Sequence, residues 1–365
     1  MRFKEFSENY VERKISDCIH IFDGTHKTPK YFDSGIPFLS VEYITNDEYK
    51  FIDEKQYKKF SKNYQFQEND FLFSRIGTIG KVKLIRNINI FSIYVSVSIF
   101  RIKISNLFYF YFYYLIQTKK FQKDLKKKSI LNATPPKINI IDLYSLKICF
   151  PNSIKEQEKI SKFFYLLDKH IELWERKLQF TKLKKSWFIN FVWRNSPFSE
   201  VNFLELFDYY DIQNKNFEKY TIGKKGIIKM NTIKETKENG RAFYKNSIIF
   251  GLGSNEIGVS IDKIGSCSPI YLTYKIKDNI YTKYFFYFSN YIFKEKENYF
   301  CKKSTRREKE ISRKLLEKIK IKLIDFDSLW KMEILDFFTK EITFLDKQII
   351  LLKKQRKFYL NKLFI

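Results

Sequence analysis

Residues 158–193 read EKISKFFYLLDKHIELWERKLQFTKLKKSWFINFVW, and the chain ends on a second version of the same pattern. When Asn190 is placed over Asn361, an offset of 171, the two versions align without a gap. Apolar residues then fall on apolar residues, as Leu167 does on Phe338, although few positions are identical. A pattern that is kept while the individual residues change indicates an internal structural repeat.

Both versions predict a long helix with a coiled-coil seam, because their apolar residues recur at alternating spacings of three and four. Two helices with matching stripes most simply pack on each other. Aromatic residues beside the seam, such as Phe188 and Tyr359, are expected to contact a partner protein. The residues expected to pair the helices are Phe164, Leu167, Ile171, Trp174 and Leu178 in the first version, and Phe338, Ile342, Leu345, Ile349 and Leu352 in the second.

Each long helix follows a segment of mixed helix and strand pattern. The second segment repeats the order of the first more loosely, with residues 227–233 in the place of the strand at 36–44, and a helix with a basic end is expected at 107–128. The predicted fold class is therefore α+β, with two globules, each followed by a long helix, and the helices packed as an antiparallel coiled coil with pseudo-twofold symmetry. The expected boundaries are 1–152 and 197–326 for the globules, and 153–196 and 327–365 for the helices.

The composition points to a polyanionic partner, since 68 Lys and Arg against 41 Asp and Glu give a formal net charge of +27. This charge is weak support for nucleic acid when taken alone, because an AT-rich coding sequence also enriches lysine. Four cysteines without CxxC spacing and only three histidines argue against a structural metal site. The most apolar run, residues 107–116, is too short to cross a bilayer. We expect a cytoplasmic protein with no membrane partner, no metal and no cofactor of its own.

Two polar loops of the first globule are candidates for DNA contact. Side chains of the loop DGTHKTPK at 23–30 can reach phosphates or base edges. In the loop SRIGTIGK at 74–81, the glycines allow a close approach to a phosphate, and Arg75 can bind guanine edges in a bidentate manner. By chemistry alone, an ordinary surface turn and a hairpin turn explain the loops as well. The candidate residues are Thr25, His26, Lys27, Thr28 and Lys30 in the first loop, and Ser74, Arg75, Gly77, Thr78 and Lys81 in the second.

Basic clusters beside further loops are candidates for phosphate contact, although solvated charge runs are the alternative. The second globule has GLGSNEIGV at 251–259 in the place of the first glycine loop. The candidates are Lys127 and Lys128 in the first globule, and Ser254, Asn255, Lys302, Lys303, Arg306 and Arg307 in the second.

Four segments together have a recognisable pattern: DGTHKTPKYFDSGIPFLSVEYI at 23–44, ENDFLFSRIGTIGKV at 68–82, PPKINIIDLYSLKICFP at 135–151 and EQEKISKFFYLLDKHIELWERKL at 156–178. With them the chain resembles the specificity subunit of a type I restriction-modification enzyme. The resemblance implies two target recognition domains that read double-stranded DNA, and a coiled coil that binds two methylase subunits. It also implies that restriction subunits join through the methylase, and that S-adenosylmethionine binds to the methylase. The second globule departs from the pattern, because it lacks the DG-H-x-x-P loop.

An enzyme is the main alternative. A DNA adenine methyltransferase needs a [DN]PP[FY] loop, whereas the nearest candidate, NATPPK at 132–137, has the wrong spacing and no aromatic residue. The sequence contains neither GxGxxG nor GxxxxGK[ST]. A coiled-coil scaffold without a DNA role would leave the two similar globules unexplained. We therefore predict a non-catalytic reader of a bipartite, asymmetric DNA target, with the unread spacer set by helix length.

Overall fold

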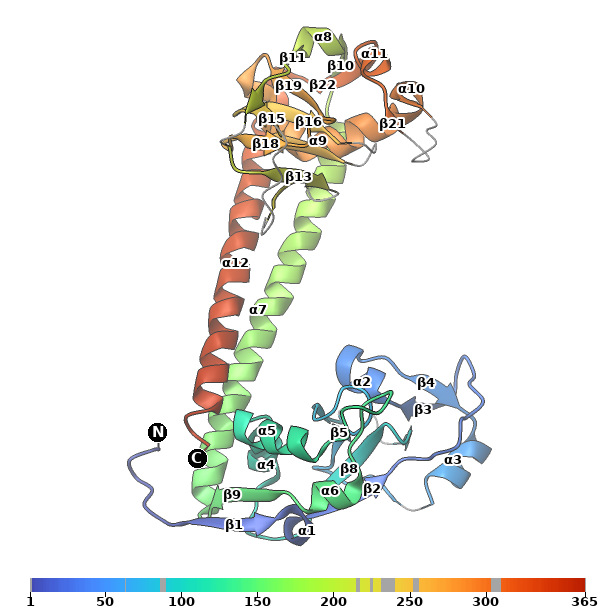
Figure 1. Ribbon diagram of the computed structural model, residues 1–365, viewed down its shortest axis with the longest axis vertical. Coiled ribbons are helices and arrows are strands. Elements are labelled where there is room, and N and C mark those ends of the chain that lie inside the picture. The colour runs from blue at the N-terminus through green and yellow to red at the C-terminus, as the bar shows by residue number, and fades with distance from the viewer. Residues whose placement is uncertain are drawn as a thin grey trace. The chain divides into compact units, whose positions relative to one another are not determined.

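The computed structural model describes residues 2–62, 64–85, 90–214, 217–223, 226–230, 240–251, 256–302 and 310–364. It divides into two units, Met1–Glu175 with Lys347–Ile365 and Arg176–Asp346. Two long helices, α7 (Ile154–Asn195) and α12 (Lys331–Leu360), each contribute one part to either unit (Figure 1).

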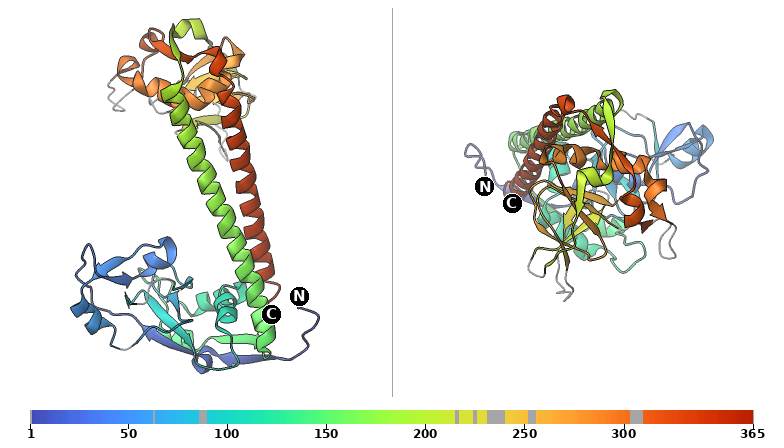
Figure 2. Two further views of the ribbon diagram at one scale, coloured as in Figure 1. Left: turned by 180° about the vertical axis from the view of Figure 1, so that it is seen from behind. Right: turned by 90° about the horizontal axis from the view of Figure 1, so that it is seen from above.

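The two long helices run antiparallel within the first unit. Asp168 pairs with Arg356, and Glu175 pairs with Lys353 at 2.6 Å, so residue numbers rise along α7 while they fall along α12. Figure 2 shows the red α12 beside the green α7. All ten predicted seam residues are buried or half-buried. The predicted fold class, α+β globules with antiparallel long helices, is confirmed.

The helices are antiparallel in the second unit as well. Lys185 donates to the Thr339 hydroxyl at 2.7 Å, and Lys182 lies 3.9 Å from Asp346. At the offset of 171, Lys185 corresponds to Arg356 of the first unit. Each unit therefore has a cation inside its helical seam at the same place of the repeat.

The two seam cations differ in their partners. Burial would lower the pKa of Arg356, but the hydrogen bonds and charge of Asp168 outweigh it, and the pKa is raised above its ordinary value. Lys185 has the uncharged Thr339 in the corresponding place, and burial lowers the pKa of this lysine. Arg356 is thus the stronger polar link between the helices.

We expect Asp168→Asn to lower the free energy of unfolding by about 1–2 kcal/mol, because it removes the charge that faces Arg356. The effect is smaller than for a fully buried pair, since 34% of the Asp168 side chain is exposed. Chemical denaturation of the full-length chain, followed by circular dichroism, measures the change. Glu175→Gln is the control, because it breaks a more exposed pair and should cost less than about 0.5 kcal/mol. Equal losses in the two variants would contradict a special role for Asp168.

The described residues of the first unit form three sheets. β1 (Tyr10–Lys14) pairs antiparallel with β9 (Lys147–Pro151), next to the start of α7. A four-stranded antiparallel sheet has the order β2 (Ile19–Asp23), β8 (Val97–Ile102), β5 (Phe71–Ser74) and β6 (Val82–Leu84). A smaller sheet has the order β4 (Lys50–Ile52), β3 (Ile36–Leu39) and β7 (Ser92–Ile93). The helices are α1 (Ile15–Cys18), α2 (Val41–Asn46), α3 (Glu54–Phe60), α4 (Tyr109–Leu115), α5 (Lys119–Lys128) and α6 (Ile140–Tyr144).

The second unit follows the same plan. β10 (Phe198–Asn202) pairs with β22 (Lys320–Ile324), and the four-stranded sheet has the order β11 (Phe207–Tyr209), β19 (Leu272–Ile276), β16 (Ser247–Phe250) and β17 (Ile257–Ser260). The smaller sheet has the order β12 (Gln213–Asn214), β15 (Gly240–Phe243) and β18 (Gly265–Cys267). Two hairpins, β13 (Tyr220–Gly223) with β14 (Gly226–Lys229) and β20 (Cys301–Lys302) with β21 (Glu310–Ile311), complete the described strands. The helical segments are α8 (Phe203–Leu206), η1 (Asn279–Tyr281), α9 (Thr282–Glu295), α10 (Glu297–Phe300), α11 (Arg313–Leu316) and η2 (Phe326–Ser328).

Each unit has an aromatic-rich core around its four-stranded sheet. In the first unit, Phe73 and Phe100 stack at 4.6 Å, and the C-terminal Phe364 packs on Tyr111 of α4 at 4.8 Å. The last residues of the chain therefore complete the core of the first unit, together with Leu360 and Leu363.

Three sequence expectations differ from the structure. The strand expected at 36–44 ends at Leu39, because Ser40 caps α2 by accepting a hydrogen bond from the amide of Glu42. The helix expected at 107–128 is two helices, because Thr118 caps α5 by accepting a hydrogen bond from the amide of Phe121. The strand at 227–233 was matched to the strand at 36–44, but the central strand of the second small sheet is β15. Residues 226–229 instead pair with β13 as a strand that begins at Gly226, whose φ is 85°, and residues 231–233 lie outside the described residues.

Candidate nucleic-acid and partner interfaces

The two candidate DNA loops of the first unit meet at one edge of its four-stranded sheet. Strands β2 and β5 are both antiparallel to β8, so they run parallel to each other and end at the same edge. The segments that converge there are residues 24–30, 75–81 and 94–96, which we call the loop edge. The order of strands in the sheet brings together residues that are far apart in the sequence.

The base of the first loop is tightly docked. The amide of Thr25 donates to the carbonyl of Ile93 at 2.9 Å. A Cβ on Gly24 would lie 2.3 Å from the carbonyl oxygen of Tyr94, so only glycine permits this approach. Thr25 is half-buried as a result. The side chains beyond this base, His26, Lys27, Thr28 and Lys30, are exposed.

Helix α3 fixes the far end of the same loop. The Gln56 side chain accepts from the amide of Lys30 at 2.8 Å and donates to its carbonyl at 2.9 Å. Sequence reasoning missed Gln56, because a glutamine on a polar helix gives no signal by itself. The exposed loop side chains are therefore presented on a backbone that is held at both ends.

The loop at residues 74–81, which we call the glycine loop, is closed by hydrogen bonds of the Ser74 side chain. Its hydroxyl donates to the carbonyl of Thr78 and accepts from the amide of Lys81 at 2.8 Å. Gly77 and Gly80 have φ of 79° and 84°, which a tight turn of this kind requires. Ser74 is thus an internal residue, whereas Gly77, Thr78 and Lys81 are exposed.

Arg75 links the two loops instead of facing solvent. Its side chain is 7% exposed, and its guanidinium forms an ion pair with Asp23 at the end of β2. The same group donates to the carbonyl of Val95 at 3.2 Å. The guanine contact expected of Arg75 would have to form from a guanidinium that is already paired within the protein. Arg75 instead holds the first loop, the glycine loop and the segment before β8 together.

Several cations surround the loop edge. The segment after α5 returns to the glycine loop, where Ile76 and Lys137 form an antiparallel bridge. Lys137 is exposed and adds a cation that sequence reasoning missed. Lys127 and Lys128 lie in the exposed last turn of α5, and Lys127 is 3.2 Å from Asp124. The edge thus offers exposed ammonium, hydroxyl and imidazole groups, which suit phosphates and base edges.

The second unit has a similar link at the same edge of its sheet. Arg241 of β15 pairs at 2.9 Å with Asp211, just after β11, and donates to the carbonyl of Tyr271, just before β19. These positions match those of Asp23 and Val95 in the first unit, although the arginine comes from a different element. Of the predicted contacts, Ser254, Asn255, Lys303, Arg306 and Arg307 lie outside the described residues, and Lys302 lies in β20.

A further stripe of apolar side chains lies outside the seam on both long helices. All eight are between 48% and 65% exposed, and on each helix they follow at spacings of seven. At the offset of 171 the two sets coincide. We call them the outer stripe: Leu166, Leu173, Phe180 and Trp187 on α7, and Phe337, Phe344, Leu351 and Phe358 on α12.

The sequence analysis assigned partner contact to Phe188 and Tyr359, and each of these residues comes one position after a residue of the outer stripe. Phe188 and Tyr359 were expected to face a partner, but they are half-buried and pack on Phe338 at 6.2 Å and Phe163 at 5.3 Å. Spacing of seven keeps a stripe in line along a helix, which is the pattern that a partner helix recognises. Four stripe residues belong to each unit. Exposed apolar residues in such an order are typical of interaction surfaces and differ from singly scattered surface residues.

Within the described residues, no helix is long and apolar enough to span a membrane, and no group of His, Cys, Asp and Glu could hold a metal ion.

Residues 7–180 match the model of the type I restriction modification DNA specificity domain. This part of the chain is therefore similar to that DNA specificity domain. The matched region of this specificity domain runs from just before β1 into α7, so it contains the whole loop edge and the Arg75–Asp23 pair. No curated protein matches the chain.

Two solved structures share the fold over nearly the whole length. One is the S subunit of a type I restriction-modification system from M. genitalium, with a TM-score of 0.64 and 16% identity over 100% of this chain and 98% of that one. The other was solved to explain complex assembly and conformational transition of the type I R-M system. It has a TM-score of 0.56 and 10% identity over 97% of this chain and 98% of that one. The fold of the specificity subunit thus extends beyond the matched domain.

Proposed function

We propose that this chain is the DNA-reading subunit of a type I restriction-modification complex and that it has no catalytic activity of its own. The observation that carries the proposal is the loop edge, where His26, Lys27, Thr28, Lys30 and Lys81 are exposed on a sheet edge within a DNA specificity domain. Exposed lysines there supply phosphate contacts, and the hydroxyl and imidazole groups supply base contacts.

The target is a bipartite site in double-stranded DNA. Each unit has its own sheet edge, and the arginine that organises the edge comes from the glycine loop in one unit and from β15 in the other. Because the two edges differ in sequence, the two half-sites differ as well. Helix length sets the unread spacer between the half-sites.

Two methylase subunits bind the outer stripe, one at the four stripe residues of each unit. Aromatic and leucine side chains of this size are typical anchors of a protein interface. S-adenosylmethionine binds to these methylase subunits, which modify the target adenine, and restriction subunits join through the methylase. The complex works on DNA in the cytoplasm.

Mapping methylated adenines in a host genome tests the proposal. The chain is co-expressed with its methylase subunit, and we expect one two-part motif with a fixed gap and two different halves. A complex that forms on a sizing column without producing such a motif would overturn the DNA-reading role. It would favour a coiled-coil scaffold, and methylation by this chain alone would favour a self-contained adenine methyltransferase.

A further inference from the structure

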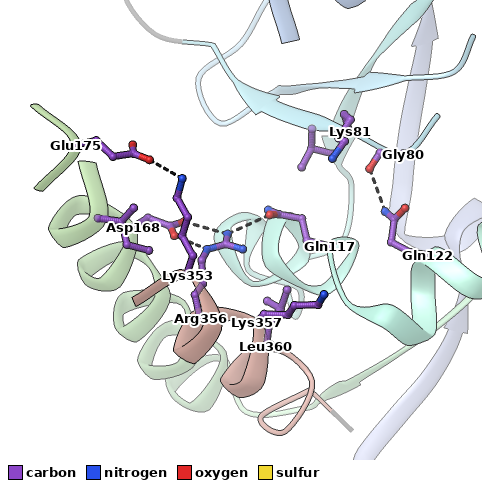
Figure 3. A pocket seen from close by; sticks show the side chains of 12 residues that line it. Gly80, Lys81, Gln117, Gln122, Asp168, Glu175, Lys353, Arg356, Lys357 and Leu360 are labelled. Carbon is purple, nitrogen blue, oxygen red and sulfur yellow. Dashed lines mark hydrogen bonds and ion pairs between the residues drawn. The ribbon is translucent and has the colours of Figure 1, made fainter. Parts of the chain in front are cut away.

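An open cleft of about 610 Å³ lies within the first unit (Figure 3). The glycine loop and α5 form one wall, and α7 with the end of α12 forms the other. The cleft begins at Gly80 and Lys81, so it is continuous with the loop edge.

The cleft has more positive than negative charge. Four cations and two carboxylates line it, which leaves a net charge of +2. Both carboxylates already have partners, since Asp168 pairs with Arg356 and Glu175 pairs with Lys353. A bound ligand therefore meets cations rather than free carboxylates.

The neutral polar groups of the cleft are also occupied. The Gln122 amide donates to the carbonyls of Gly80 at 2.9 Å and Ile116 at 2.7 Å, and Gln117 accepts from Arg356 at 3.0 Å. Lys81 and Lys357 remain, both exposed and without an ion pair among the described residues. In Figure 3 they approach the cleft from opposite walls.

We infer that this cleft binds backbone phosphates of the DNA strand that runs from the first half-site into the spacer, with Lys81 and Lys357 as the contact residues. The inference rests on the proposed DNA-reading function and adds a contact from the long helix. Lysine binds phosphate as a point charge and releases counterions, so this contact contributes affinity without sequence preference.

The internal repeat makes the contact specific to the first unit. At the offset of 171, Lys353 corresponds to Lys182 and Arg356 to Lys185, but Lys357 corresponds to Ser186. The second unit therefore lacks the unpaired lysine at this place of its helix.

The test uses the full-length chain in complex with its methylase subunit. The variants are Lys81→Gln, Lys357→Gln and the double variant, and the matched control is Lys354→Gln, an exposed lysine three residues before Lys357 that does not line the cleft. Binding is measured by fluorescence anisotropy between 50 and 300 mM KCl, on about 40-base-pair duplexes with and without the mapped motif. Each lost phosphate contact should reduce the slope of log affinity against log salt by about 0.9, so by about 1.8 in the double variant.

Near 100 mM salt each substitution should weaken binding to both duplexes by about tenfold, and the ratio between the duplexes should stay the same. A control variant that loses as much slope, or cleft variants that keep the parental slope, would overturn the inference. A changed ratio between the duplexes would overturn it too, because it would indicate base reading. If the parental complex shows no salt-dependent binding at all, the proposed DNA-reading function itself fails.

Discussion

Replacing Phe180 and Trp187 by serine is expected to reduce the number of methylase subunits on this chain from two to one. Both side chains belong to the outer stripe of the second unit and are more than half exposed. Removing their apolar surface from an interface should cost about 1–2 kcal/mol each, which weakens that site on the order of 100-fold. Size-exclusion chromatography with light scattering gives the mass of the complex directly.

The stripe also provides its own controls. Gln179→Ser changes an exposed neighbour of Phe180 outside the stripe and should leave the mass unchanged. Leu166→Ser with Leu173→Ser should remove the methylase of the first unit, and all four substitutions together should remove both. The contacts recorded for Phe180 and Trp187 are with near neighbours on α7, Lys184 and Phe191, so the thermal midpoint of the chain itself should fall only slightly. If the variant with both Phe180 and Trp187 replaced by serine still binds two methylase subunits, the outer stripe is not the docking surface.

The long helices were predictable because their pattern is local. Residues such as Leu167 and Phe338 recur at spacings of three and four, and burial of one helix face follows from that period alone. The outer stripe was harder to recognise, because apolar residues at spacing seven also occur at the edge of a broad seam. Only the exposure of Trp187, next to the half-buried Phe188, distinguishes the two faces.

The candidate site was predictable only in part. The sequence identifies Lys27 and Lys81 as polar loop residues, but their shared edge depends on β8 lying between β2 and β5. The environment of Arg75 was not predictable, because its partner Asp23 is 52 positions away and lies in a different loop. An arginine in a glycine loop gives the same sequence signal whether it reads a base or holds the loop.

Arg75→Gln is expected to abolish recognition of the first half-site. The arginine side chain is 7% exposed, and removing its charge takes the guanidinium partner away from Asp23 at the end of β2. Asp23 then keeps only the amide of Gly24 at 2.9 Å and the His26 ring at 3.3 Å. Loss of one partner from a pair of this kind costs about 2–3 kcal/mol, less than for a fully buried pair because Asp23 is 31% exposed. The two loops then lose their common anchor, and we expect affinity for the motif to fall on the order of 100-fold. Arg13→Gln, an exposed arginine on β1, is the control.

A double-mutant cycle separates anchoring of the loops from base reading. If Arg75 acts by anchoring the loops, then Asp23→Asn should reproduce most of the loss of DNA affinity that Arg75→Gln causes. The double variant should be no worse than Arg75→Gln alone, which also loses the hydrogen bond to the carbonyl of Val95. Affinity should fall for all single-base variants of the first half-site alike. If Arg75 contacted a guanine directly, Arg75→Gln would instead relax recognition at one base position by about 1–3 kcal/mol, and the Asp23→Asn variant would keep nearly the parental DNA affinity.

By the same reasoning, Arg241→Gln should weaken recognition of the second half-site only, because Arg241 and Asp211 form the corresponding link in the second unit.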